Sequence, residues 1–336
     1  MRAVELRALD GKPESMVLVE RPVPRPGNRQ VLVRIAASPI NPSDLAFLSG
    51  AYIKKKLPVI PGFEASGTVV AAGGGFMARF LVGKRVACAA PHDGDGAWAE
   101  FMVTSAQLCL PLRKNVSFEQ GASLLVNPLT AWALMDIAKR GRHRAVAQTA
   151  AASALGRMIF RLGQRFGIPV INIVRRDEQV ELLQTLGAKY VLNSNDSNFA
   201  DRLQKLCHEL NASLAFDAVA GELTGRVLQA LPKQGRLIIY GGLSLQPCKI
   251  DPRAFILDDK HVEGFWISRA LKKGNPLRQL RNAMQAQKFL ASDLKTEVRA
   301  RLPLEKALIG LQQYAGDMTG GKILLAPNLS GKEIIT

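Results

Sequence analysis

The sequence has 336 residues, of which 47% are hydrophobic and 22% are charged. This length and composition suit a globular protein with two hydrophobic cores and exclude a disordered or fibrous chain. The net charge of +17 favours polyanionic ligands such as nucleotides, coenzyme A, acidic carrier proteins or nucleic acid, although solubility alone explains it equally well.

Short strands broken by turns are predicted for the N-terminal part of the chain. Residues 1–11 alternate polar and apolar side chains, as a first strand does. Further strands are predicted over residues 31–37, 67–72 and 85–89. Pro39, Asn41 and Pro42 interrupt the strand pattern and mark a turn. We therefore expect this part of the chain to be rich in β-structure.

Helices and strands alternate from about residue 118 onwards. Helices are predicted over residues 118–124, 130–138, 155–166, 178–186, 199–207 and 225–231. Strands are predicted over residues 145–149, 170–174, 190–192, 214–218 and 236–240, and the last of these closes the series. Short strands separated by helices indicate an α/β fold with a parallel, doubly wound sheet.

The alternation stops after about residue 257. Helices are predicted over residues 279–289 and 304–314, and a final strand is predicted over residues 321–326. This tail need not be a domain of its own, since it could return to the opening strands and complete them.

A turn of the dinucleotide-binding type is predicted after the strand over residues 145–149. Residues 145–156 read AVAQTAAASALG, and Ala151, Ser153 and Gly156 occupy the three positions of the usual GxGxxG pattern. Small residues let the backbone approach a pyrophosphate, and the predicted helix over residues 155–166 directs its N-terminus toward that charge. Ala154 and Leu155 are expected to contact the cofactor together with the three motif positions. The alternative is an alanine-rich helix start without a ligand.

Arg175 and Arg176 follow the next strand, about twenty residues beyond the turn. Sites that prefer NAD carry an acidic residue here, which binds the ribose 2′-hydroxyl. Two arginines would instead pair with a 2′-phosphate through charge-assisted hydrogen bonds. The sequence therefore predicts NADPH as the cofactor, and a solvated basic turn is the alternative.

Tyr240, Gly241 and Gly242 stand at the end of the strand over residues 236–240. Two glycines at the carboxyl edge of a parallel sheet let the backbone pass close to a ligand, which suits the nicotinamide side of the cofactor. A plain turn explains them equally well.

The cysteines and histidines are not spaced as metal ligands. Cys88, Cys109, Cys207 and Cys248 form no CxxC pair, and the four histidines are equally scattered. Free thiols indicate a reducing compartment. No apolar run is long enough to span a membrane and the N-terminus lacks a secretory core, so we expect a cytoplasmic protein with no membrane partner. A matrix protein that has lost its transit peptide would look the same.

The order of six motifs resembles that of the medium-chain dehydrogenase/reductase superfamily. They are INPSD (residues 40–44), PGFEASGTVV (61–70), NPLTAW (127–132), AAASALG (150–156), LGAKYV (186–191) and YGG (240–242). The resemblance covers the whole chain and implies a β-rich, GroES-like catalytic domain built from both chain ends around a Rossmann domain. We expect the GroES-like domain over residues 1–117 and 257–336 and the Rossmann NADPH-binding domain over residues 118–256.

The resemblance implies the zinc-independent branch of this superfamily. Zinc alcohol dehydrogenases carry a GHE motif with a cysteine ligand upstream, whereas Phe63 replaces the histidine here and INPSD holds no cysteine. Quinone oxidoreductases and 2-enoyl thioester reductases belong to this branch. Tyr52 and the segment GFWISR (residues 264–269) resemble the mitochondrial-type enoyl reductases. The turn AAASALG matches neither the NASNSGVG-like turn of that group nor the AAAGGVG-like turn of quinone reductases, so the subfamily stays open.

Site roles follow from the same resemblance. Tyr52 is expected to be catalytic, as a hydrogen-bond donor or proton source toward the substrate oxygen, although an exposed turn tyrosine is the alternative. Asn41 is expected to orient the site, and Asp44 to cap the following turn. Asn127 and Thr130 are expected near the nicotinamide and its ribose, although Thr130 could simply cap a helix. The expected substrate pocket consists of Phe63, Phe265 and Trp266, although core packing is the ordinary role of a tryptophan.

The predicted reaction is hydride transfer from NADPH to an activated C=C bond. The acceptor could be an enone, a quinone or an acyl thioester, including one held by an acidic acyl carrier. The alternatives are an NADPH:quinone oxidoreductase and a non-catalytic protein that binds NADPH or nucleic acid; the sequence has no nucleic-acid-binding motif. Family members are often dimers, so a homodimer is expected.

Two basic runs flank the predicted pocket segments. Lys54, Lys55 and Lys56 follow Tyr52, and Lys272 and Lys273 follow the GFW segment. They could steer phosphate-bearing acyl donors such as coenzyme A thioesters, or they could be solvated loop residues.

Overall fold

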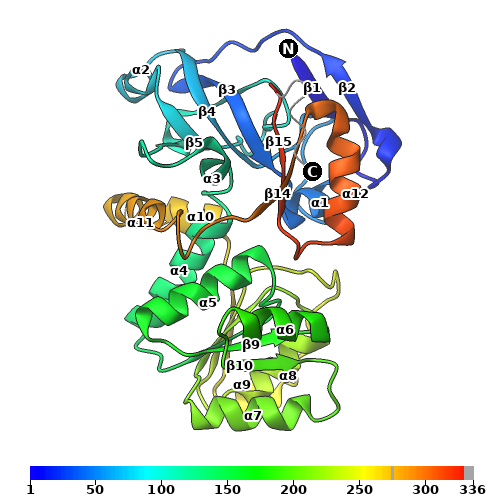
Figure 1. Cartoon of the computed structure of the whole chain (residues 1–336), viewed down its shortest axis with the longest axis vertical. Coiled ribbons are helices and arrows are strands. Elements are labelled where there is room, and N and C mark those ends of the chain that lie inside the picture. Colours follow the sequence, from blue (N-terminus) through cyan, green and yellow to red (C-terminus); the bar gives the residue numbers. More distant parts are fainter. Residues whose placement is uncertain (274–275, 329–336) are drawn as a thin grey trace. The chain divides into compact units, whose positions relative to one another are not determined.

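The computed structural model describes residues 1–273 and 276–328 and divides the chain into two compact units (Figure 1). The first unit combines Met1–Asn127 with Gln285–Thr336, and the second consists of Pro128–Met284. None of the helices in the described ranges is long and apolar enough to cross a membrane.

The first unit is built on β-strands from both ends of the chain. Its strands are β1 (Arg2–Leu6), β2 (Met16–Glu20), β3 (Gln30–Pro39), β4 (Glu64–Ala72), β5 (Arg85–Ala89), β6 (Phe101–Ser105), β7 (Cys109–Pro111), β14 (Val298–Leu302) and β15 (Lys322–Leu325). β1 pairs with β2, and the others form one sheet in the order β14-β15-β3-β4-β5-β7, with β6 also paired to β3. The C-terminal tail completes this sheet, because Leu324 and Leu325 of β15 lie opposite Pro39 and Ser38 of β3.

Short helices connect or cover these strands. They are η1 (Pro13–Ser15), α1 (Pro42–Leu48), α2 (Phe76–Leu81), η2 (Ala106–Leu108), α3 (Phe118–Ala122), η3 (Leu304–Lys306) and α12 (Ala307–Gly316). The turn predicted from Asn41 and Pro42 is the start of α1, where proline occupies the first helical position and its missing N–H costs nothing.

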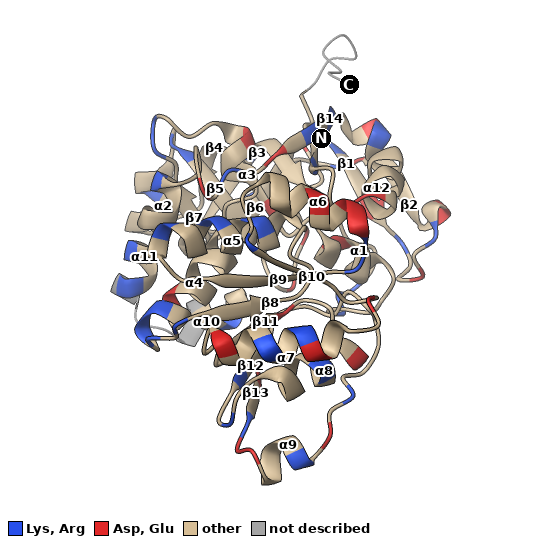
Figure 2. Cartoon of the chain, turned by 60° about the horizontal axis from the view of Figure 1, so that its bottom comes forward, with Lys and Arg blue, Asp and Glu red and all other residues tan. Residues whose placement is uncertain are grey.

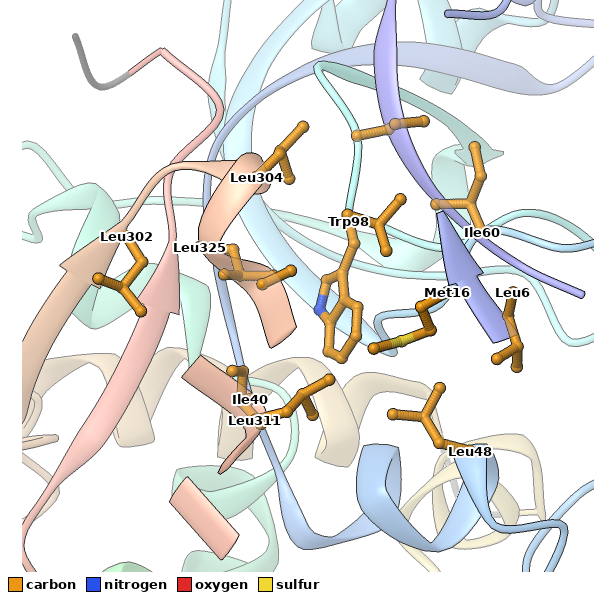
Figure 3. Packing of buried hydrophobic residues seen from close by; sticks show 14 of the residues in the cluster. Leu6, Met16, Ile40, Leu48, Ile60, Trp98, Leu302, Leu304, Leu311 and Leu325 are labelled. Atoms are coloured by element: carbon orange, nitrogen blue, oxygen red, sulfur yellow. The ribbon is translucent and has the colours of Figure 1, made fainter. Parts of the chain in front are cut away.

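A buried apolar cluster joins the two ends of the chain within this unit (Figure 3). Trp98 is fully buried in it. The surrounding leucines, isoleucines and methionine come from the N-terminal part (Leu6, Met16, Ile40, Leu48, Ile60) and from the tail (Leu302, Leu304, Leu311, Leu325). Burying a side chain of this size stabilises the fold by about 1.5–3 kcal/mol, so the tail is bound to the N-terminal part by many such contributions.

The second unit is a six-stranded parallel sheet with helices between the strands. Its strands are β8 (Val146–Gln148), β9 (Val170–Val174), β10 (Tyr190–Asn193), β11 (Leu214–Asp217), β12 (Arg236–Ile239) and β13 (His261–Gly264), in the order β10-β9-β8-β11-β12-β13. Its helices are α4 (Asn127–Arg140), α5 (Ala154–Phe166), α6 (Asp177–Thr185), α7 (Phe199–Glu209), α8 (Glu222–Ala230), α9 (Arg253–Ile256), α10 (Ile267–Lys273) and α11 (Pro276–Lys288). This is the strand order of the Rossmann fold, so the predicted α/β fold class is confirmed.

The parallel series extends one strand further than predicted. β13 pairs in parallel with β12, with His261 opposite Arg236, so the strand over residues 236–240 does not close the sheet. The prediction was wrong because β13 reads HVEG and is largely exposed, whereas the other parallel strands are apolar and mostly buried.

The chain is divided between the two compact units at residues that differ from the expected domain boundaries. Residues 118–127 belong to the first unit, where α3 packs against β3, β4 and β5. Residues 257–284 belong to the second unit, because β13 extends its sheet. The changes in sequence pattern at about residues 118 and 257 therefore mark changes of secondary structure, not of packing.

Candidate functional site

The predicted cofactor segments follow three strands of the parallel sheet, β8, β9 and β12. β8 lies between β9 and β11, so the chain crosses to one side of β8 first and to the other side later. Ligands of such sheets bind at the carboxyl ends of the strands, near the point where the direction changes. The small-residue turn follows β8, Arg175 and Arg176 follow β9, and the YGG segment follows β12. All of them therefore lie at the same edge of the sheet.

The turn after β8 is tight even though only one of its three key positions is glycine. A Cβ atom at Gly156 would lie 2.5 Å from the carbonyl oxygen of Ala151, so no larger residue fits without moving the backbone. Ala150 adopts a left-handed conformation, with φ of 49°, which usually requires glycine. Ser153 caps α5 by accepting a hydrogen bond from the Gly156 N–H at 3.1 Å. Ala151, Ser153 and Gly156 thus form a compact turn at the N-terminus of a long helix.

Thr149 and Asp217 hold the ends of two strands together at this edge of the sheet. Neither residue was predicted from the sequence. The Thr149 hydroxyl donates to Asp217 Oδ1 at 2.7 Å and accepts from the Ala218 N–H at 2.9 Å, which ties the end of β8 to the end of β11. Asp217 also accepts from the Thr224 hydroxyl at 2.6 Å. The feature that could have identified Asp217 from the sequence is an aspartate at the end of an otherwise apolar strand.

Arg175 and Arg176 project from the end of β9 as exposed side chains. Their backbone is held in place, because the Asn195 side chain donates to the Arg175 carbonyl at 2.9 Å. Within the described part of the chain, neither guanidinium forms a hydrogen bond or an ion pair. The neighbouring carboxylate of Asp177 accepts instead from Asn193, at 2.8 Å. The two guanidinium groups are therefore available to an anionic ligand.

The segment after β12 has room for a ligand on one side only. A Cβ atom at Gly241 would lie 2.8 Å from the Ala218 carbonyl oxygen, whereas one at Gly242 would meet no atom within 4 Å. The Tyr240 hydroxyl is buried and has no hydrogen-bond partner in the described structure; burial raises its pKa. Phe265 and Trp266 follow β13 at the same edge, where the Phe265 N–H donates to the Ile239 carbonyl at 2.8 Å.

Tyr52 and Phe63 come together in the first unit. Tyr52 is 42% exposed, and its ring packs edge-on against Phe63 with 5.7 Å between the ring centroids. Phe63 packs in the same way against the buried Phe47 at 5.6 Å. Lys55 lies beside this group with its ammonium 5.9 Å from the Phe63 ring, and it donates to the Gly94 carbonyl at 2.8 Å. The Tyr52 ring thus rests on the core, while the residue as a whole stays accessible.

A buried polar cluster surrounds Glu64, which follows Phe63 in the chain. Asn41 donates from Nδ2 to Glu64 Oε1 at 3.0 Å, and its Oδ1 accepts from the Lys322 ammonium. Lys322 also donates to the Tyr314 hydroxyl at 2.9 Å, and Glu64 Oε2 accepts from the Val126 N–H at 2.9 Å. The side-chain amide of Asn41 therefore already has hydrogen-bond partners within the protein. This suits a role in positioning the loop around the site rather than direct contact with a substrate.

Two carboxyl groups share this cluster. Burial raises the pKa of Glu64 to about 7, although the Asn41 amide, the Val126 N–H and the Lys322 charge oppose the shift. Burial also raises the pKa of Asp44 to about 7. The Asp44 carboxylate accepts from the Asn41 N–H at 2.8 Å, which fits the predicted capping role at the start of α1.

Comparison with known proteins settles the family. Residues 27–114 match the alcohol dehydrogenase GroES-like domain, and residues 154–285 match the zinc-binding dehydrogenase family. A Mesorhizobium loti crystal structure, assigned as an NADPH:quinone reductase, is 36% identical with a TM-score of 0.89 and covers 97% of this chain and 98% of its own. The chain belongs to the medium-chain dehydrogenase/reductase superfamily.

Members of this superfamily from two branches are similar over most of the chain. The mitochondrial enoyl-[acyl-carrier-protein] reductase of Arabidopsis thaliana is 29% identical over 316 residues, which are 92% of this chain and 83% of that protein. The quinone oxidoreductase of Thermus thermophilus, whose complex with NADPH is known, is 26% identical with a TM-score of 0.77, over 97% and 100% of the two chains. This protein is therefore an oxidoreductase of the quinone-reductase and enoyl-reductase type.

The family resemblance implies that Phe63 replaces the histidine ligand of zinc-containing members of the superfamily. Within residues 1–273 and 276–328, no three His, Cys, Asp or Glu side chains are grouped so that they could hold a metal ion.

The remaining predicted residues are Asn127, Thr130 and the lysines of the two basic runs. Asn127 begins α4 and Thr130 lies within its first turn, and both side chains are buried. Thr130 therefore does not cap the helix. Lys54 and Lys56 are exposed, and Lys272 and Lys273 belong to α10 with side chains outside the described part of the structure.

Proposed function

We propose that this protein is an NADPH-dependent, zinc-independent reductase that transfers hydride to an activated C=C bond in an enone or a 2-enoyl thioester. The observation that carries the proposal is the pair of exposed guanidinium groups, Arg175 and Arg176, which have no partner in the described structure and follow β9 of a Rossmann sheet. The 2′-phosphate is the group that distinguishes NADPH from NADH, and arginines are its usual partners at this position.

The edge of the sheet fits the rest of the cofactor. The start of α5 presents backbone N–H groups to a pyrophosphate, and the tight turn at Gly156 keeps that backbone accessible. The open side of Gly242 and the unpartnered Tyr240 hydroxyl suit the nicotinamide half. Asn127 and Thr130 are proposed to contact the nicotinamide and its ribose. When bound, NADPH supplies the hydride for the reaction.

Tyr52 is the proposed catalytic residue. Addition of hydride to the β-carbon of the acceptor leaves negative charge on the carbonyl oxygen, and a proton must then reach the α-carbon. The Tyr52 hydroxyl donates a hydrogen bond or a proton to the developing enolate, while its ring is steadied against Phe63. Phe63, Phe265 and Trp266 are proposed to line the acyl pocket, and Asn41 is proposed to hold the loop that precedes Tyr52.

A quinone is the second candidate acceptor. The similarity to the Mesorhizobium loti protein favours it, since that protein is the more identical of the relatives described above. The two candidates differ only in the electron acceptor, so the proposed cofactor site is common to both.

Consumption of NADPH with three acceptors tests the proposal. Crotonyl-CoA, a simple cyclic enone and a naphthoquinone are compared under one set of conditions, with the saturated product identified by mass spectrometry. Turnover of the thioester or the enone to its saturated product is expected. Turnover of the naphthoquinone alone would replace the proposal by the quinone-reductase alternative. Tight binding of NADPH without any turnover would make the protein a non-catalytic NADPH-binding protein.

A homodimer is proposed for the second unit. β13 is an edge strand of the parallel sheet, so its outer backbone groups are unpaired with any described strand. The adjacent α9 and the residue after it expose Phe255, Ile256 and Leu257. An open sheet edge beside exposed apolar side chains is typical of a surface that a second copy covers.

A further inference from the structure

Helix α2 presents an unusual apolar face to solvent. Phe76 is 89% exposed and Phe80 is 58% exposed, and the four-residue spacing places both side chains on one side of the helix. Met77 and Val82 are exposed beside them. The opposite side is anchored, since Ala78 and Leu81 are buried in the core of the sheet. One face of α2 therefore packs against the core, and the opposite face exposes two phenylalanines to solvent.

The chain segments around α2 carry many positive charges and no exposed negative charge. α2 packs against β3, β4 and η2; residues 21–43, 65–92 and 101–118 of these segments contain no Asp or Glu, and Glu64, the first residue of β4, is buried. They contain Arg21, Arg25, Arg29, Arg34, Arg79, Lys84, Arg85, Arg113 and Lys114. Figure 2 shows Arg but no Asp or Glu on the ribbon of α2.

Three of these basic residues lie directly at the apolar face. Arg79 is exposed within α2 itself. The Lys84 ammonium lies 4.4 Å from the centroid of the Phe80 ring. Arg29 is exposed and joins the loop before α2, where its N–H donates to the Gly74 carbonyl at 3.1 Å. The phenylalanines and the positive charges thus form one surface, which we call the α2 surface (Arg29, Phe76, Arg79, Phe80 and Lys84).

We propose that the α2 surface docks the protein reversibly on membranes that contain anionic lipids. Aromatic side chains that protrude from a basic surface enter the boundary between headgroups and acyl chains, while the cations stay at the level of the lipid phosphates. Phe76 is too exposed to have protein walls around it. A fluid bilayer can close around such a side chain, whereas a protein partner would need a hollow of matching shape.

The proposed contact is peripheral and leaves the reductase chemistry unchanged. No described helix can span a membrane, and this contact needs none, because two side chains and three charges make it. The proposal departs from the expectation of no membrane partner, which rested on the lack of a long apolar run. The α2 surface contains none of the residues proposed to bind NADPH or substrate, so an acceptor that is soluble in water should be reduced equally well without it.

Co-sedimentation of the full-length protein with vesicles tests the proposal. Binding is measured to vesicles of phosphatidylcholine alone and to vesicles that also contain phosphatidylglycerol, in a series of salt concentrations. The wild-type protein is expected to sediment with the anionic vesicles and to be released as salt is added. Equal binding to both kinds of vesicle, or binding to neither, would overturn the proposal.

Paired variants locate the contact. F76S/F80S and R79Q/K84Q are each expected to weaken binding to anionic vesicles at least tenfold while leaving NADPH turnover with a soluble enone unchanged. L18S/V23S removes two exposed apolar residues of the same unit, and K12Q/K295Q removes two exposed charges; both should bind as the wild type does.

Circular dichroism confirms that each variant is folded before it is compared. If the α2 variants bind vesicles as tightly as the control variants do, the contact lies elsewhere and the proposal is wrong. If vesicles do not bind but an acidic acyl carrier protein binds in a manner that depends on Phe76 and Phe80, the surface recognises a protein and the membrane assignment fails.

Discussion

At the scale of single residues, the proposed chemistry depends on side chains in two contrasting environments. Arg175, Arg176 and Tyr52 are exposed, so they can meet a ligand directly. Asn41 and Glu64 are buried among hydrogen bonds, so they can act only by holding the structure around the site. Changes to the first group should alter binding or turnover, whereas changes to the second should alter stability and its dependence on pH.

Replacing Tyr52 with phenylalanine should slow turnover without loosening the cofactor. The ring keeps its packing against Phe63, and only the hydroxyl is lost. We expect kcat for an enone or thioester to fall by about 100-fold, the lower range for a general acid, with the Kd for NADPH unchanged. Tyr190→Phe, in the other unit, serves as the matched control. A Tyr52→Phe enzyme with wild-type kcat would rule out Tyr52 as the proton or hydrogen-bond donor.

The raised pKa of Glu64 makes stability depend on pH in a definite direction. The folded protein holds a proton on this group up to about pH 7, whereas an exposed glutamate loses it near pH 4.3. Between these values the folded state binds more protons than the unfolded state, so the free energy of unfolding falls as pH rises. Glu64→Gln removes the pH dependence that comes from Glu64. The free energy of unfolding of the variant minus that of the wild type should therefore increase by about 1–3 kcal/mol between about pH 5 and about pH 8.

Urea denaturation at several pH values measures this difference. Glu14→Gln, which changes an exposed glutamate of the same unit, should follow the wild-type curve at every pH. A Glu64→Gln curve that runs parallel to the wild type would show that Glu64 keeps an ordinary pKa in the folded protein.

The exposed candidate residues could be proposed from the sequence alone, whereas the contacts of the buried ones could not. Arg175, Arg176 and Tyr52 stand at fixed places in motifs, so their positions could be predicted from neighbouring residues. The partners of Asn41 could not, because Lys322 lies 281 residues away in the chain and meets Asn41 only when β15 pairs with β3. Thr149 and Asp217 were missed for the same reason, since their hydrogen bond joins strands that three helices (α5, α6 and α7) separate in the chain.

At the scale of elements, the tight joint between β8 and α5 is the feature on which the cofactor site depends. Gly156 lets the first turn of α5 approach the backbone of Ala150 and Ala151. Ser153 satisfies one of the free N–H groups at that end of the helix. The other N–H groups remain available for an anion, so the geometry of this joint should control affinity for the pyrophosphate.

Gly156→Ala should therefore weaken NADPH binding. The added methyl group would lie 2.5 Å from the Ala151 carbonyl oxygen, so the turn and the helix must move apart. We expect the Kd for NADPH to rise about tenfold or more, a cost of about 1.4 kcal/mol or above. The control is Gly316→Ala, at the end of α12, where a Cβ atom meets nothing within 4 Å. Equal affinities of the two variants for NADPH would contradict the role given to this joint.

Elements with a strong apolar pattern were predicted well, and polar or very short ones were not. The predicted strand over residues 85–89 coincides with β5, and the predicted helix over residues 155–166 differs from α5 by one residue. The predictions missed β2, β6, β14, α9 and α10, and they also missed α2, β7 and β13. α2 exposes its phenylalanines, β7 has only three residues, and β13 is an exposed edge strand, so none of them shows the regular apolar spacing on which prediction depends.

At the scale of the whole molecule, the chain builds two units, one of which is formed from both of its ends. A discontinuous domain was expected from the family resemblance and from the tail that breaks the βα alternation, and the first compact unit likewise contains residues from both ends of the chain. The exact boundaries could not be predicted, because α3 and β13 each lie beyond a change in sequence pattern but pack with the preceding part of the chain.

Sedimentation velocity tests the proposed homodimer. The wild-type protein should sediment as a dimer, because the β13 edge and the apolar residues of α9 offer a self-complementary surface. I256E/L257E, which buries two like charges at that surface, should sediment as a monomer. Leu18→Glu, at an exposed site of the other unit, should remain a dimer. A monomeric wild type, or a double variant that stays dimeric, would place the interface elsewhere or remove it.

The most direct test of the account is a calorimetric titration of the protein with NADPH and with NADH. The wild type should bind NADPH more tightly, and R175Q/R176Q should lose about 10- to 100-fold in affinity for NADPH alone, since hydrogen bonds to charged groups contribute about 1.5–3 kcal/mol. K205Q/K233Q removes the same charge elsewhere on the same unit and should bind NADPH as the wild type does. A wild type with no preference for NADPH, or a double arginine variant that binds it with undiminished affinity, would contradict the central claim.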